Sequence, residues 1–100
     1  MTWLETNHPQ HKVFAIPNGG KRNKIAAIKL KAEGVRAGVP DLFIPSLRLF
    51  VEMKKPEGGR VSPAQKEWLS YLSECGYSVG VANGFEEAKT LFNKTLELFK

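Results

Sequence analysis

Two acids and a lysine stand among apolar residues in the middle of the chain. Residues 38–55 read GVPDLFIPSLRLFVEMKK, in which Asp41, Glu52 and Lys54 stand among residues typical of β-strands. Departures from a local pattern are expected where a protein does chemistry. Two carboxylates and an ammonium group are suited to holding a cation beside a phosphate and to stabilising the charge that develops there.

The same stretch predicts a β-hairpin that would bring the two acids together. If the turn is symmetric and centred just after Ser46, Asp41 lies opposite Glu52, and Phe43 lies opposite Phe50. Directly opposed residues have Cβ atoms only about 4.5–5.5 Å apart. A slip of one residue would bury the charges and expose the apolar set. In the predicted register the other face carries Leu42, Ile44, Leu49, Val51 and Met53.

Two opposed carboxylates repel each other and call for a compensating partner. A hard divalent cation would compensate, because Mg²⁺ prefers oxygen ligands. Lys54, two residues beyond Glu52 on the same face, could then act on the attacking water or on the phosphate. An ion pair between Lys54 and either acid on a solvated edge, worth at most about 1 kcal/mol, explains the spacing equally well. Spacing alone leaves both interpretations open.

The elements around the hairpin follow from periodicity and turn residues. Ser62, Pro63 and Gln65 form a helix start with an N-cap, a proline at the first position and a capping-box glutamine. Gly76 ends this helix. Trp68 and Cys75 fall at its apolar positions, so we expect Trp68 in the core and Cys75 to be a small buried residue. We expect strands at 13–16, 41–54 (the hairpin) and 77–82, and helices at about 24–33, from 63, and from about 86. This order predicts an α/β fold, a small mixed β-sheet flanked by helices.

Composition limits the chain to one small domain, which we expect to span residues 1–100. The residues are 42% hydrophobic and 25% charged, and no apolar run is long enough to span a membrane. No secretory leader is recognisable, and the one cysteine excludes an internal disulfide and fits a reducing cytoplasm. A net charge of +5 favours polyanionic partners.

The central stretch also resembles the PD-(D/E)xK nuclease signature, with Pro40-Asp41 as its first half and Glu52-Met53-Lys54 as its second. The segments AIPNGGKRN, LKAEGVRAGVPDLFIP and RVSPAQKEWLSYLSECGYSVGVANGFEEA are similar to the virus-type replication-repair nuclease (VRR-NUC) domain in its small stand-alone phage-like form. The resemblance runs from Ala15 to Ala88 and implies a restriction-endonuclease-like core.

The resemblance also implies roles for individual residues. Asp41, Glu52 and the Met53 backbone carbonyl would bind Mg²⁺ or Mn²⁺, and the catalytic set would be Asp41, Glu52, Lys54 and Gln65. Gln65 also fits a helix cap completely, and the two roles are compatible. Members of the family usually contribute a further glutamate from an N-terminal helix, and Glu5 is not assigned that role.

Basic and glycine-rich segments beside the hairpin are candidate DNA contacts. A glycine turn before a basic helix start can hold phosphates through backbone amides and side chains, although it can also be a solvated turn. The predicted contacts are Asn18, Gly19, Gly20, Lys21, Arg22, Lys24, Lys55 and Arg60.

Together these features predict a metal-dependent DNA endonuclease that cuts branched DNA such as four-way junctions, in the cytoplasm of a bacterium or a phage-infected host. The alternatives are a non-catalytic nucleic-acid-binding module and a nicking or flap nuclease of the same fold. One site cuts one strand, so the resolution of a junction implies a homodimer. Trp3, Leu4 and the C-terminal helix are candidate interface residues, unless they only complete the core of a monomer.

Overall fold

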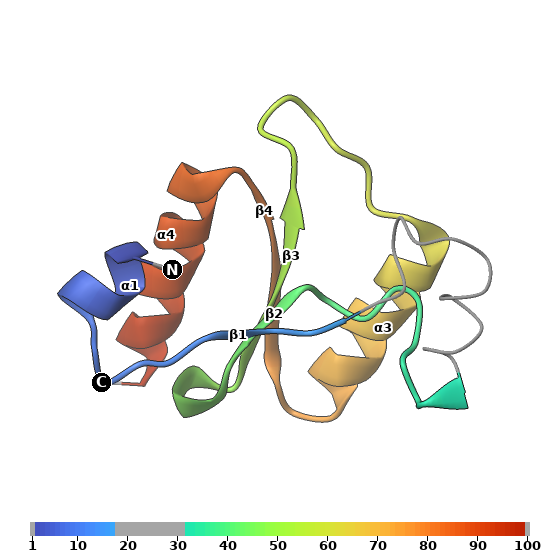
Figure 1. Ribbon diagram of the computed structural model, residues 1–100, viewed down its shortest axis with the longest axis horizontal. Helices are drawn as coiled ribbons and strands as arrows, with labels where there is room; N and C mark the ends of the chain where they lie inside the picture. Colours follow the sequence, from blue (N-terminus) through green and yellow to red (C-terminus); the bar gives the residue numbers. More distant parts are fainter. Residues whose placement is uncertain (1, 18–31, 100) are drawn as a thin grey trace.

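The computed structural model describes residues 2–17 and 32–99 (Figure 1). The predicted helix at 24–33 falls almost entirely outside the described residues. In chain order the described elements are α1 (Thr2–Asn7), β1 (Phe14–Ala15), β2 (Leu42–Ile44), the short 3₁₀ helix η1 (Pro45–Leu47), β3 (Leu49–Lys54), α3 (Pro63–Glu74), β4 (Ser78–Asn83) and α4 (Phe85–Leu98).

The described strands form one mixed sheet in the order β1-β2-β3-β4. The first three strands pair antiparallel, whereas β4 pairs parallel with β3 through the connecting helix α3. This arrangement confirms the predicted α/β class with a small mixed sheet. Within the described residues no helix is both long enough and apolar enough to cross a membrane.

The register of the central hairpin is the predicted one. Phe43 pairs with Phe50, and Leu42 pairs with Val51. The turn is made by η1 and by Arg48, whose φ of 49° puts a non-glycine residue in the left-handed region. The Arg48 amide donates to the Pro45 carbonyl and closes the turn. A symmetric turn is therefore sufficient to fix which face each side chain occupies.

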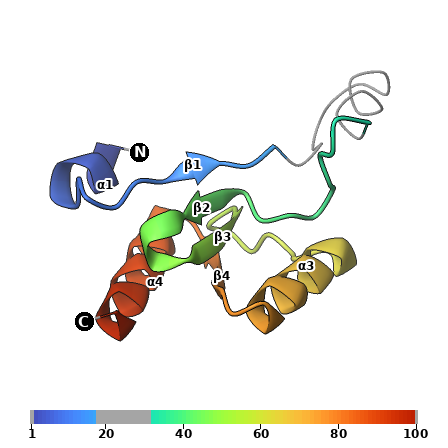
Figure 2. The same ribbon diagram turned by 90° about the horizontal axis from the view of Figure 1, so that it is seen from below.

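The two long helices cover opposite faces of the sheet. Figure 2 shows β4 between α3 and α4, with β1 farthest from both helices. Helix α4 packs closely on β4, since a Cβ added at Gly80 would lie 2.5 Å from the Leu91 side chain. The core lies on the α4 side and contains Leu4, Ile44, Leu47, Leu49, Val51, Ala82 and Phe92. This is the apolar face that the hairpin pattern predicted.

Three details differ from the sequence prediction. Helix α1 was not among the predicted elements, and its Leu4 is 4% exposed in the core. Cys75 was expected to be buried and is exposed, and Trp68 is only partly buried, in an edge-to-face contact with Tyr71. The reason is that α3 contacts the sheet mainly along β4, so that Leu72 is its one buried residue.

Candidate active site

The structure brings the four predicted catalytic residues to one place. Asp41 immediately precedes β2, Glu52 and Lys54 lie in β3, and Gln65 lies in the first turn of α3. Because Gln65 of α3 donates a hydrogen bond to Glu52, the Glu52 carboxylate lies on the side of the sheet that carries α3, a helix seen beside the sheet in Figure 1. The site therefore forms where the end of β3 meets the start of α3.

Asp41 is held by the backbone of both neighbouring strands. Its Oδ2 accepts a hydrogen bond from the Met53 amide at 2.9 Å, and its carbonyl accepts one from the Ile16 amide at 2.7 Å. The preceding Pro40 is fully buried. These contacts fix the Asp41 carboxylate beside β3.

A glycine allows this segment to approach α3. Gly38 has a φ of +92°, and a Cβ there would lie 2.9 Å from the carbonyl carbon of Ala64. Any side chain would push the loop away from the first turn of α3. Sequence reasoning did not single out Gly38, although the Gly-Val-Pro-Asp context contained it.

Glu52 is a buried acid with incomplete hydrogen bonding. It is 2% exposed; its Oε2 accepts from Gln65 Nε2 at 3.2 Å and lies 3.6 Å from Lys54 Nζ. Its Oε1 is buried, and no hydrogen-bond donor of the described residues reaches it. Burial, then the charge of Asp41 and a side-chain hydrogen bond with Asp41, raise the pKa of Glu52 from 4.5 to about 7, against the opposing effect of Lys54.

Gln65 connects the helix cap to the charged residues. Its side-chain Oε1 accepts hydrogen bonds from Lys54 Nζ and from the Ser62 backbone amide, each at 2.8 Å. The backbone amide of Gln65 donates to Ser62 Oγ at 3.2 Å. The capping box is therefore complete, as predicted. Because its Nε2 donates to Glu52, Gln65 is simultaneously a cap and a member of the charged cluster.

The loop from β3 to α3 is fastened to the end of β4. The Gly84 amide donates to the Lys54 carbonyl at 3.0 Å, and Asn83 Nδ2 donates to the Lys55 carbonyl at 3.1 Å. Gly59 lies so close that a Cβ there would be 3.1 Å from the Lys54 Cβ. These contacts hold the loop against the Lys54 side chain.

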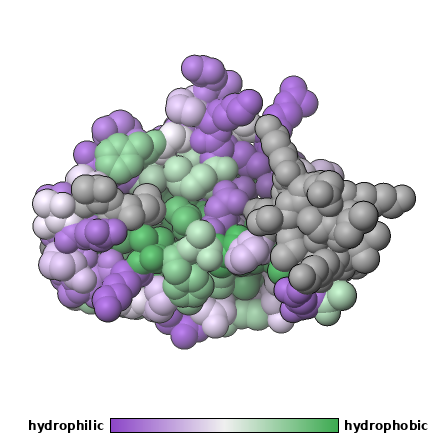
Figure 3. All heavy atoms as spheres, viewed as in Figure 1, coloured by the Kyte–Doolittle hydropathy of each residue, from purple (hydrophilic) through white to green (hydrophobic). Residues whose placement is uncertain are grey.

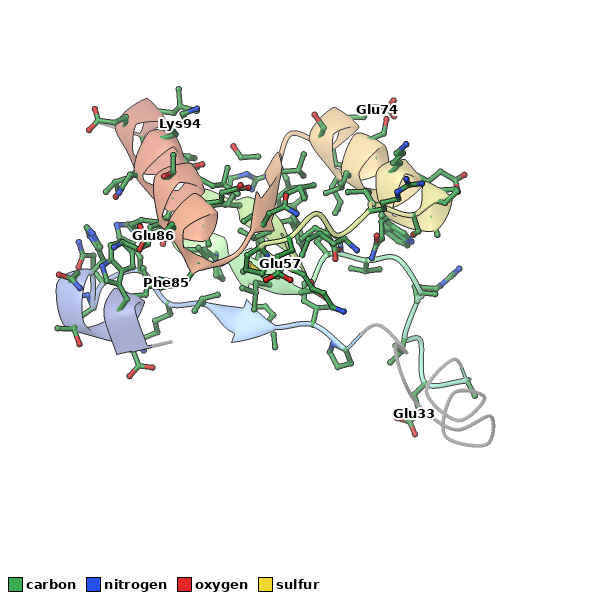
Figure 4. The ribbon with its side chains drawn as sticks, turned by 90° about the horizontal axis from the view of Figure 1, so that it is seen from above. Glu33, Glu57, Glu74, Phe85, Glu86 and Lys94 are labelled. Carbon is green, nitrogen blue, oxygen red and sulfur yellow. The ribbon has the colours of Figure 1, made fainter. Side chains whose placement is uncertain are left out.

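A shallow hollow of about 680 Å³ opens beside Lys54 along this loop. Figure 4 shows Glu57 on the loop, over the middle of the molecule between α3 and α4. Lys55 and Arg60 are exposed. The hollow is lined by Met53, Lys54, Lys55, Glu57, Gly58, Gly59 and Arg60.

The other predicted site residues lie elsewhere. The candidate DNA contacts Asn18, Gly19, Gly20, Lys21, Arg22 and Lys24 fall outside the described residues. Glu5 is exposed on α1, which packs beside α4 on the other face of the sheet. Within the described ranges no three His, Cys, Asp or Glu side chains gather, so the acids at this site are Asp41 and Glu52.

Comparisons with known proteins found a matching family model and a similar solved structure. A family model of the VRR-NUC domain matches residues 2–86. A solved structure described as a VRR_NUC domain protein has a TM-score of 0.72 and 32% sequence identity, over 86% of this chain and 68% of the other. No curated protein matches the chain.

Proposed function

Because this chain belongs to the VRR-NUC domain family and has its nuclease-type fold, we propose that it is a metal-dependent endonuclease that hydrolyses phosphodiester bonds in DNA. The observation that carries the proposal is the buried Oε1 of Glu52, which meets no hydrogen-bond donor among the described residues, in a carboxylate whose ionised form is disfavoured by burial and then by Asp41. A purely structural carboxylate in that position would be costly. A cation shared with Asp41 removes the cost.

The donor set fits Mg²⁺ or Mn²⁺. Asp41, Glu52 and the Met53 carbonyl would offer the hard oxygen ligands that these ions prefer, with water and a substrate phosphate completing the shell. When bound, the ion would supply an activated water and neutralise charge on the phosphate. The protein keeps its two carboxylates in place for this through the Met53 amide and Gln65.

Lys54 provides the third charge. Its Nζ is held 2.8 Å from Gln65 Oε1, and the Lys54 side chain is 15% exposed. The ammonium group is therefore oriented but still accessible to a substrate. Hydrolysis adds a water oxygen to phosphorus and breaks a P–O bond, with negative charge building up on the phosphate oxygens. An ammonium fixed beside those oxygens stabilises that charge in the transition state.

The substrate side of the proposal is branched DNA bound by a homodimer. Lys55 and Arg60 beside the hollow would contact phosphates, as would the basic segment at residues 18–24. A four-way junction has two-fold symmetry, and a two-fold dimer would present one site to each cut.

Cleavage of labelled linear duplex, flap and four-way junction DNA, with Mg²⁺, Mn²⁺ or EDTA, tests the function. We expect cleavage with either metal and none in EDTA, and we expect Asp41→Asn and Glu52→Gln to abolish it. Glu57→Gln is the matched control, because Glu57 is an exposed acid in the neighbouring loop. DNA binding with no cleavage under any metal would instead identify a non-catalytic module.

A further inference from the structure

An aromatic row crosses the sheet beside the candidate active site. Phe14, Phe43 and Phe50 are successive partners on β1, β2 and β3. Phe43 stacks on Phe50 with ring centroids 4.2 Å apart, and Phe14 meets Phe43 edge-to-face at 5.7 Å. Tyr77 meets both Phe43 and Phe50 edge-to-face at one end of the row. Phe14, at the other end, is 53% exposed. Figure 3 shows hydrophobic surface near the middle of one face of the molecule, with hydrophilic residues around it.

The strand register places this row one step from the two acids. Phe43 follows Asp41 by two residues, and Phe50 precedes Glu52 by two, so both rings share a face with the carboxylates. Two residues along a strand span roughly 7 Å. A polymer held by one phosphate at the acids would therefore have its neighbouring unit within reach of the exposed edge of the row.

The charges around the row favour a nucleic acid over an apolar partner. The guanidinium of the exposed Arg48 lies 4.4 Å from the centroid of the Tyr77 ring. Lys12, two residues before Phe14, is also exposed. Cations beside accessible aromatic rings are the combination that binds unpaired strands, since the cations hold the backbone and the rings stack on bases.

We propose that Phe14, supported by Phe43, stacks on an unpaired base of the DNA strand whose phosphate would be held by the cation at Asp41 and Glu52. The inference rests on the proposed nuclease function and specifies its substrate class, DNA with an unpaired base next to the bond that is cut. In an intact duplex each base is already paired and stacked, so it reaches the ring only by leaving the helix. A mismatch, a gap or a branch point supplies a base without that cost.

Fluorescence of 2-aminopurine tests the contact without cleavage. Two duplexes that differ only in whether one 2-aminopurine is paired or unpaired are titrated in Ca²⁺, an oxygen-binding cation that replaces Mg²⁺, with the full chain and its Phe14→Ala, Phe14→Leu and Phe14→Trp variants, and a gel checks that the DNA stays uncut. We expect the wild type and Phe14→Trp to quench the unpaired probe and to bind that duplex at least about tenfold more tightly. Phe14→Ala and Phe14→Leu should lose this preference and keep their affinity for the paired duplex.

The variants separate the possible results. Phe14→Leu keeps the apolar bulk, so it reports on the aromatic face even if Phe14→Ala does not fold. An unchanged preference in Phe14→Leu, or an equal loss on both duplexes, overturns the stacking proposal. The proposal is also overturned if the wild type sediments as a dimer and the Phe14 variants sediment as monomers, because Phe14 would then be covered by a second copy of the chain. Cleavage by the wild type in Mg²⁺ is measured separately: intact stacking without cleavage rejects the nuclease function alone.

Discussion

Glu52 is the residue on which the chemistry depends most. It is almost fully buried, and in the described part of the chain no donor reaches its Oε1, while Lys54 and Gln65 compensate only Oε2. Hydrophobic substitution of a buried charged group is often neutral or stabilising. The presence of an acid here therefore fits a selected chemical role better than a contribution to stability.

The raised pKa of Glu52 gives a pH-dependent test of that idea. The unfolded chain ionises Glu52 near 4.5 and the folded chain only near 7, so the unfolded state binds fewer protons between these values. Folding stability should fall across this window as the pH rises, by roughly 3 kcal/mol in total. In EDTA, thermal unfolding of Glu52→Gln should lack most of this fall. Equal pH profiles for the wild type and Glu52→Gln would contradict the assigned pKa.

Lys54→Ala should separate turnover from substrate binding. Because the ammonium is needed mainly in the transition state, we expect kcat to fall about 100-fold or more and KM to change little. Lys54 also lowers the pKa of Glu52, so the acid limb of the pH–rate profile should move to higher pH. Lys94→Ala, which removes an exposed lysine on α4 away from the site, is the control. A Lys54→Ala enzyme with an unchanged kcat would remove Lys54 from the mechanism.

At the scale of elements, the close approach of the segment before β2 to the start of α3 assembles the site. Gly38→Ala should disrupt it, because the added Cβ would meet the backbone of Ala64 at 2.9 Å. Gly34→Ala is a matched control: its φ of +97° is equally strained, but a Cβ there meets no atom of the described residues within 4 Å. In denaturant unfolding we expect Gly38→Ala to lose about 1–3 kcal/mol more stability than Gly34→Ala. We also expect Gly38→Ala to lose cleavage activity. Equal losses would show that backbone strain alone matters.

The capping box allows the two roles of Gln65 to be measured separately. Ser62→Ala removes the helix cap and should cost about 1 kcal/mol of stability, with most of the cleavage activity retained. Gln65→Ala also removes the hydrogen bonds to Lys54 and Glu52, so it should reduce kcat well beyond its effect on stability. Parallel losses of kcat in the two variants, matched to their stabilities, would reduce Gln65 to a cap.

Local patterns predicted the elements that local forces decide. The hairpin register followed from a period of two, and the start of α3 followed from its capping box, because both depend on neighbouring residues. The exposure of side chains could not be predicted in this way, because it depends on tertiary contacts. Cys75 follows the apolar spacing of α3, but that helix contacts the sheet mainly along β4, and Cys75 is exposed. Phe14 likewise reads as an ordinary strand residue until β1 pairs with β2.

At the scale of the whole molecule, the structure narrows the candidates for a dimer interface. Leu4 of α1 and Phe92 of α4 are each 4% exposed within the chain itself, so the interpretation that they complete the core of one chain holds for them. The end of α4 is different, since Leu98 is 78% exposed and Phe99 is 52% exposed. Exposed apolar residues of this size at the end of an amphipathic helix are available for self-association.

We therefore expect a dimer that depends on Leu98. Light scattering at micromolar concentration should give twice the chain mass for the wild type and the chain mass for Leu98→Glu, while the exposed Lys94→Gln on the same helix serves as the control. On a synthetic four-way junction the wild type should cut two symmetric strands, and Leu98→Glu should leave single nicks, because each monomer carries one Asp41, Glu52 and Lys54 set. A wild-type monomer that nicks linear duplex as readily as a junction would refute both the dimer and the preference for branched DNA.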